Sequence, residues 1–218
     1  MQKLIQNWEE TANPNVVFLS CYQMMTGNTL AAIEQQDFKD PAWVDQLLHH
    51  FADYYFLALD AYEKDVPSAP RIWQLTFNAA NDARTLPLQN LLLGVNAHIN
   101  YDLAFAVSDL LEGEWQQLSD VERQTRFDDY THVNLVIAET IDAVQDDVLE
   151  PAMPAMDIID KLFGRFDEFL ISYWISEYRE AVWENVLRLL AAKNDTERDA
   201  VSAAIEKEAL KLAEMIYS

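Results

Sequence analysis

The chain has 218 residues, and its 37 acidic against 15 basic residues give a formal net charge of −22. This charge repels phosphate backbones and anionic lipid headgroups, so it argues against nucleic acids and membranes as partners. Four glycines and seven prolines are too few for the many turns of a β-sandwich or barrel. The single cysteine, Cys21, excludes an internal disulfide framework and a cysteine-rich zinc site within one chain.

The first part of the chain predicts helices, because apolar residues recur at helical spacing and strand-like alternation is hard to find. Asp40 followed by Pro41 is typical of a helix start, with an N-cap and a proline at the first helical position. That helix should end before 66–70, whose two prolines cannot continue it. Four helices are expected before residue 87: 2–12, about 15–37, 41–65, and one that carries Trp73, Phe77 and Ala80.

The same period continues through the rest of the chain. Ser119 and Glu122 have the spacing of a capping box, and we expect Thr196 with Asp199 to cap the last helix. The prolines of 151–155 break the chain between them. The helices expected here are about 87–111, one from Ser119 to about Val148, one that ends at Gly164, about 165–193, and a last one from Thr196.

These segments make roughly eight helices with short joints. The expected fold class is therefore all-α, a single-domain bundle over 1–218 with no β-sheet. No stretch has the continuous apolar run of an export signal. Residues 11–33 carry no charge, but Asn13, Pro14 and Gly27 interrupt them, so no membrane span is expected. We expect a cytoplasmic protein whose oligomeric state the sequence leaves open.

Candidate functional residues are polar residues on faces that the helical period assigns to the core, because a buried polar group without a partner is costly. Asp102 falls on the apolar stripe of its helix, and His98 lies four residues before it. At this spacing both side chains can point at one spot, so His98 and Asp102 are the candidate catalytic pair. Asn96 and Asn100 form a second pair at the same spacing and are candidate ligand-binding residues. The apolar stripe itself runs through Leu88, Leu91, Leu92, Val95, Ile99 and Ala106.

The following helix repeats this pattern in reverse order, with Asp128 four residues before His132. If the two helices are antiparallel neighbours, His98, Asp102, Asp128 and His132 would converge. Helical bundles build metal sites from such residues, and nitrogen and oxygen ligands would suit zinc, iron or manganese.

Two further residues are candidates for ligand binding. Asn134 lies on the main apolar stripe of its helix. Arg179 stands among apolar residues, where it would pair with Asp102 or stack on an aromatic ring. Three interpretations of the whole cluster stay open: a metal site, a metal-free catalytic or ligand pocket, and a structural hydrogen-bonded network in which Asp102 orients His98.

The stretch 91–107, LLLGVNAHINYDLAFAV, resembles a bacterial family known only as a domain of unknown function and marked by an Asn-Ala-His-Ile-Asn-x-Asp-Leu core. The resemblance also takes in 51–62, Trp73, Asp129, Val133, Asn134, Arg179, Ala181 and Trp183, so it covers most of the chain. It implies an α-helical domain without an established activity, and it groups Asn96, His98, Asn100, Asp102 and Asn134. His49, His50 and His132 are not part of the family's pattern, which puts the four-ligand metal site in doubt.

Three functions are compatible with these residues. The first is a small-molecule hydrolase or lyase in which His98 is a general base oriented by Asp102, with or without a divalent metal. The alternative is a non-catalytic module that holds an apolar or amphipathic small molecule between helices, with the NAHINYDL cluster structural. The third is a scaffold whose acidic surface attracts a basic partner.

Overall fold

Helices make up most of the part of the chain that the computed structural model describes, residues 1–144, 147–148 and 168–218, and none of these residues is in a β-strand. The all-α prediction is therefore confirmed. In chain order the elements are α1 (Gln2–Glu10), α2 (Val16–Glu34), α3 (Pro41–Lys64), the 3₁₀ turn η1 (Val66–Ser68), α4 (Arg71–Ala80), α5 (Pro87–Val95), the π-helix η2 (Asn96–Asp102), α6 (Leu103–Glu112), α7 (Asp120–Val144), α10 (Glu168–Ala191) and α11 (Asp195–Tyr217).

Two helices, α3 and α7, begin at the N-caps that the sequence predicts. The Asp40 side chain accepts a hydrogen bond from the Trp43 backbone N–H at 3.1 Å, and Pro41 is the first residue of α3. Before α7 the Glu122 carboxylate accepts from the Ser119 N–H at 2.7 Å, while the Glu122 N–H donates to Ser119 Oγ at 3.4 Å. Both predicted caps are confirmed.

The start of the last helix corrects the prediction. Its N-cap is Asn194, whose side chain accepts from the Glu197 N–H at 3.0 Å. The Glu197 carboxylate in turn accepts from the Lys193 N–H at 2.9 Å. These bonds satisfy the N–H groups of Glu197 and Lys193 and place the N-cap two residues before Thr196, so α11 begins at Asp195.

The expected helix over 87–111 is present, but its middle departs from α-helical geometry. The chain runs from α5 through η2 into α6, and the π-helix covers the stretch NAHINYD. A π-helix has more residues per turn than an α-helix, so the buried face shifts along the sequence. Within η2, Asn96, Ala97 and His98 are buried one after another, whereas Ile99 of the expected stripe is only half-buried.

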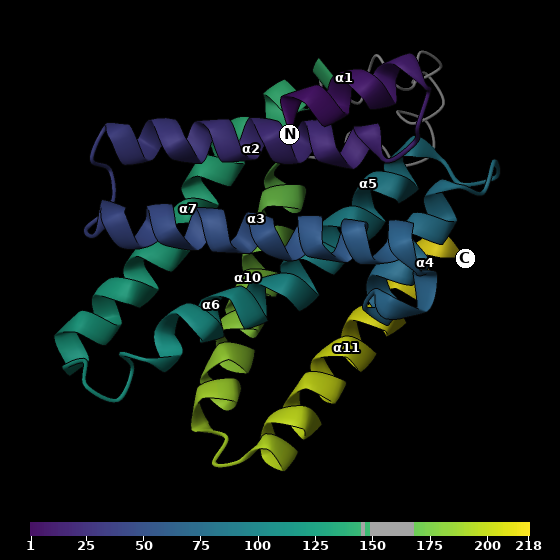
Figure 1. The fold of residues 1–218 in the computed structure, drawn as a ribbon. Coiled ribbons are helices and arrows are strands. Elements are labelled where there is room, and N and C mark those ends of the chain that lie inside the picture. The colour runs from purple at the N-terminus through teal and green to yellow at the C-terminus, as the bar shows by residue number, and fades with distance from the viewer. Residues whose placement is uncertain (145–146, 149–167) are drawn as a thin grey trace.

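The elements pack so that η2 lies in the interior of the bundle. Figure 1 shows α2 and α3 side by side, with the axes of α10 and α11 at a steep angle to them and the end of α11 beside α4. The π-helix contacts α3 and α4 as well as α10 and α11, while α7 packs against α2 and α10. The segment that carries the sequence motif is thus surrounded by helices from both halves of the chain.

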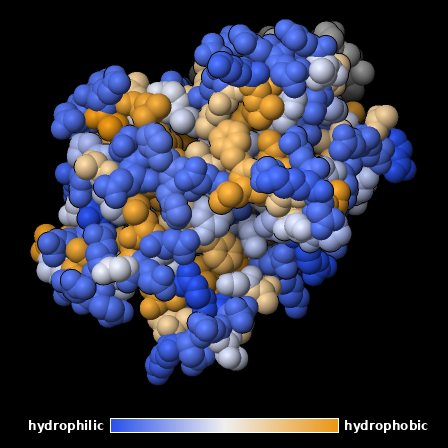
Figure 2. All heavy atoms as spheres, in the orientation of Figure 1, coloured by the Kyte–Doolittle hydropathy of each residue, from blue (hydrophilic) through white to orange (hydrophobic). Residues whose placement is uncertain are grey.

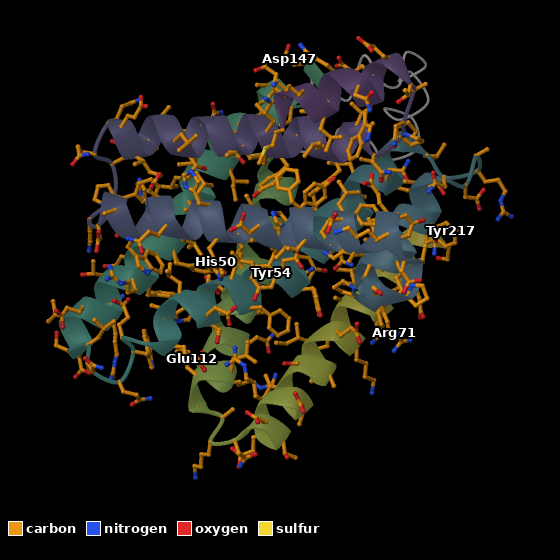
Figure 3. The ribbon with its side chains drawn as sticks, viewed as in Figure 1. His50, Tyr54, Arg71, Glu112, Asp147 and Tyr217 are labelled. Carbon is orange, nitrogen blue, oxygen red and sulfur yellow. The ribbon has the colours of Figure 1, made fainter. Side chains whose placement is uncertain are left out.

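A surface contact ties three elements together on the side of α3 that faces α6 (Figure 3). Asp109 of α6 accepts a hydrogen bond from the Tyr54 hydroxyl at 2.6 Å and pairs with Arg198 of α11 at 2.9 Å. His50 Nε2 lies 3.7 Å from the same carboxylate. Elsewhere on this side the surface is mostly hydrophilic, with small separate apolar patches (Figure 2).

By length and composition alone, α2 would be able to cross a membrane. Core helices of soluble proteins share these properties. In this fold α2 buries Phe18, Leu19 and Tyr22, among others, against α3, α5 and α7.

Two predictions lie outside the described residues: the chain break at 151–155 and the helix that ends at Gly164. The next helix, expected over about 165–193, is described from Glu168 to Ala191 as α10.

Candidate functional site

The candidate site is built on a histidine–aspartate pair within the π-helix. Nδ1 of His98 lies 3.0 Å from Oδ2 of Asp102, one turn further along η2. Only 2% of His98 and 1% of Asp102 is exposed. With Asp102 ionised, its carboxylate can only accept, and this hydrogen bond assigns the proton to Nδ1 and leaves the lone pair of the imidazole on Nε2. The predicted approach of these two side chains is what the structure shows.

Trp73 of α4 is a third member of the site. Its indole N–H donates to both carboxylate oxygens of Asp102, at distances of 3.0 and 3.1 Å. Trp73 itself is fully buried. Asp102 is therefore held from two sides, which fixes the plane of its carboxylate and the orientation of His98. Sequence reasoning placed Trp73 on a core face and did not assign it to the site.

Aromatic rings enclose the imidazole. Phe51 stacks on His98 with ring centroids 3.6 Å apart and an angle of 8° between the planes, and Tyr22 meets it edge-on at 4.5 Å. Phe18 and Tyr55 complete the enclosure, with centroids 6.0 and 6.1 Å from the imidazole. These rings come from α2 and α3, so the site joins the two helices to η2.

Three buried polar atoms in this enclosure have no hydrogen-bond partner among the described residues: Nε2 of His98 and the hydroxyl oxygens of Tyr22 and Tyr55. Most buried polar groups in folded proteins are hydrogen-bonded, so each exception calls for a reason. The rings of both tyrosines pack against His98, with centroids 4.5 and 6.1 Å from the imidazole.

Burial sets the direction of the pKa shifts in the pair. Removal from water lowers the pKa of His98, although its bond to Asp102 opposes this. Burial likewise raises the pKa of Asp102 against the contributions of His98 and Trp73. A lowered histidine pKa keeps the imidazole neutral at pH 7, which is the form that can take up a proton.

The two asparagines of the motif bond to each other and to α11. Asn100 Nδ2 donates to Asn96 Oδ1 at 2.9 Å, and Asn96 Nδ2 donates to the Ala209 carbonyl at 2.9 Å. The predicted i, i+4 contact is thus present. Its partners are backbone and amide groups, so the pair anchors α11 on η2.

Arg179 and Asn134 belong to α10 and α7 and are not bonded to the His98 pair. Arg179 stacks over the ring of Tyr130 at 4.3 Å and donates to the Tyr130 carbonyl at 2.7 Å. The predicted aromatic stacking is therefore present, whereas Arg179 makes no ion pair with Asp102. Asn134 lies one turn after Tyr130 on α7, and its Oδ1 is buried without a partner.

The four side chains expected to bind a metal do not come together. Asp128 pairs with Lys39 at 2.5 Å on the surface, and His132 packs edge-on against Phe38. No group of three or more His, Cys, Asp or Glu side chains among the described residues is placed to hold a metal ion. The physical reason is that α7 packs on α2 and α10 rather than on η2. The convergence of His98 and Asp102 with Asp128 and His132 was a wrong expectation.

The comparisons with known proteins give a family. The model of a family of unknown function, DUF5995, matches residues 1–218. The chain belongs to this family. No curated protein and no solved structure matches the chain.

In this member of DUF5995, the paired histidine and aspartate have the arrangement that many enzymes use for a histidine general base. One ring nitrogen is fixed by a carboxylate, and the other is left with its lone pair. The carboxylate has a further donor in Trp73. Such an arrangement is able to accept a proton at Nε2 and to stabilise the imidazolium that results.

Proposed function

We propose that the protein is an enzyme acting on a small molecule, with Nε2 of His98 as the general base. The observation that carries this proposal is the state of the two ring nitrogens: Nδ1 lies 3.0 Å from the Asp102 carboxylate, and Nε2 is buried without a partner among the described residues. Buried polar atoms are as a rule hydrogen-bonded, so an unpartnered lone pair in so dry a place calls for a partner, which a substrate proton would provide.

The chemistry would be a proton transfer to Nε2. The base takes a proton from water or from an acidic C–H or O–H of the substrate, and the electron pair left behind attacks a carbonyl or expels a leaving group. The imidazolium forms beside Asp102, whose carboxylate favours the positive charge. The proton then returns to the leaving group, so His98 ends as it began. Hydrolysis and elimination both fit this sequence.

The enclosure suggests a substrate that is small and largely apolar. The faces and edges of Phe51, Phe18 and Tyr22 offer contacts to apolar or aromatic groups. The Tyr22 and Tyr55 hydroxyls are unpartnered donors for a carbonyl or hydroxyl oxygen of such a molecule.

The proposed proton transfer uses His98 and Asp102 and does not involve a metal ion. Zinc, iron or manganese was a possible cofactor of this site, but the described residues bring no third ligand to His98 and Asp102. The two residues also bond to each other, which leaves Nε2 as the one nitrogen of the pair still free to bind an ion.

Full burial supports a second candidate, a non-catalytic module that holds an apolar small molecule against the same rings. With His98 2% exposed, a ligand enters only when α2 or α3 moves aside. In this case Nε2 would accept a hydrogen bond from the ligand and no bond would break.

The experiment that tests the proposal compares four forms of the full chain: wild type, His98→Gln, Asp102→Asn and the control His49→Ala. His49 is an exposed histidine on α3 and bonds to a carbonyl of its own helix. Hydrolysis of 4-nitrophenyl acetate and butyrate is measured, with circular dichroism to verify the fold. Loss of a general base should lower the rate by about 10²–10⁴-fold in His98→Gln, while His49→Ala keeps the wild-type rate.

Two results would contradict the proposal. Equal rates in wild type and folded His98→Gln would exclude His98 as the base for these esters. Binding of 4-nitrophenol that depends on His98, without turnover of either ester, would favour the binding module.

A further inference from the structure

Arg179 is a buried cation that the described acidic residues leave without a counter-charge. Only 3% of the residue is exposed. Its hydrogen bond at 2.7 Å goes to the carbonyl oxygen of Tyr130, a neutral acceptor. Charged side chains are almost never fully buried unless they are paired, because removing an ion from water is costly. The position therefore calls for a negative partner.

Other arginines of this protein that are partly or mostly buried are paired with carboxylates. The chain has 37 acidic residues, and Arg126, which is also mostly buried, bonds to two of them. Its Nη1 lies 2.6 Å from Asp40, and its Nε lies 3.0 Å from Glu114. Arg198 likewise pairs with Asp109 and Glu112. Arg179 differs from both, since no described carboxylate forms an ion pair with it.

The groups around Arg179 leave donors for an oxyanion. Its Nε is buried, and no described residue hydrogen-bonds to it. The Tyr130 ring covers the face of the guanidinium at 4.3 Å, so a ligand has to approach the edge, where the N–H groups point. An edge of a guanidinium matches the two oxygens of a carboxylate.

Asn134 adds a second unsatisfied group on the same stretch of α7. It follows Tyr130 by one helical turn, so the two side chains project from the same face of α7. Its Oδ1 is buried and unpartnered. Since the oxygen and nitrogen of an amide exchange places by a flip, the same position can present an N–H₂ donor to an anion.

We propose that Arg179 anchors a small carboxylate ligand, with Asn134 as a second donor beside it. The two residues stand on α10 and α7, and neither is bonded to His98 or Asp102, so the proposed anion site uses other side chains than the proposed general base. The ligand supplies the negative charge that the described residues do not.

The test measures thermal unfolding of the full chain in sodium acetate and sodium formate, each against sodium chloride at equal ionic strength. The chloride series is needed because the net charge makes stability depend on salt in any case. Binding at ten times the dissociation constant should raise the Tm by about 3–6 °C over chloride. The variant Arg179→Met should lose this rise, and the control Arg188→Met, on the same helix, should keep it.

A measurement on the wild type alone covers the case that Arg179→Met does not fold. Arginine Nε–H signals are followed by NMR during an acetate titration, and one buried signal should shift and saturate. The proposal is overturned if acetate and formate stabilise no more than chloride does, if phosphate alone stabilises, or if no Nε–H signal saturates.

Discussion

At Gly94 the backbone of α5 approaches the ring of Phe18 so closely that a Cβ built there would lie 2.4 Å from Phe18 Cδ2. Phe18 is one of the rings around His98. A single hydrogen at Gly94 therefore lets α2 come near enough to enclose the imidazole. Such a contact involves ring atoms near the backbone, which cannot move aside as the end of a flexible side chain can.

We expect Gly94→Ala to lower the free energy of unfolding by about 1–3 kcal/mol, as overpacking does in a close-packed core. The matched control is Gly27→Ala in α2, where a Cβ meets nothing within 4 Å. There the better helix propensity of alanine should raise stability by about 0.5–1 kcal/mol. Urea denaturation measures both, and a Gly94→Ala chain as stable as the wild type would contradict this account of the enclosure.

At the scale of the element, the start of α11 shows how two similar local signals compete. Asn194 with Glu197 and Thr196 with Asp199 both have the spacing of a cap. In the structure the first pair is used, and Glu197 reaches back to the Lys193 N–H. The longer glutamate side chain makes this reciprocal bond possible, whereas Asp199 is one methylene shorter.

We expect Asn194→Ala to lower the free energy of unfolding by about 1 kcal/mol, the usual cost of losing an N-cap. Thr196→Ala should change it by no more than about 0.5 kcal/mol, since it removes no cap. Thermal or urea unfolding of the two variants decides between them. If Thr196→Ala lowers the free energy of unfolding more than Asn194→Ala does, Thr196 is the cap and this account of the helix start is wrong.

What the sequence predicted at this scale depends on how local the signal is. The caps at Asp40 and Ser119, and the approach of His98 to Asp102, involve residues three or four apart, so spacing alone was sufficient. The π-helix was not predicted, because the apolar pattern that distinguishes it from an α-helix differs only slightly over seven residues.

Tertiary contacts were beyond reach of the same reasoning. Trp73 donates to Asp102 across 29 residues of chain, and nothing in the spacing of the two indicates that α4 meets η2. The expected metal site failed for a related reason. It required α7 to lie beside the motif, whereas α7 packs on α2 and α10.

At the scale of the whole molecule, the net charge of −22 acts on every element at once. Described arginines on the surface pair with carboxylates, as Arg84 does with Asp82 and Arg198 with Asp109. The remaining acidic residues repel one another, and this repulsion is stronger in the compact state than in the unfolded chain.

We therefore expect salt to stabilise the protein. Raising sodium chloride from 10 to 500 mM shortens the screening length and should raise the Tm by several degrees, because repulsion is screened more than the buried contacts are. Scanning calorimetry measures the change. A Tm that is constant or falls over this range would mean that surface ion pairs outweigh the repulsion.

The most direct test of the central claim is the protonation of His98, followed by ¹⁵N NMR of the imidazole in the full chain and assigned with His98→Gln. The account predicts a proton on Nδ1 and a bare Nε2 at pH 7. Because burial lowers the pKa of His98, the ring should stay neutral as the pH falls below about 6.5, the ordinary value for histidine. A proton on Nε2, or an imidazolium at pH 7, would contradict the account, since neither form can act as the base that we propose.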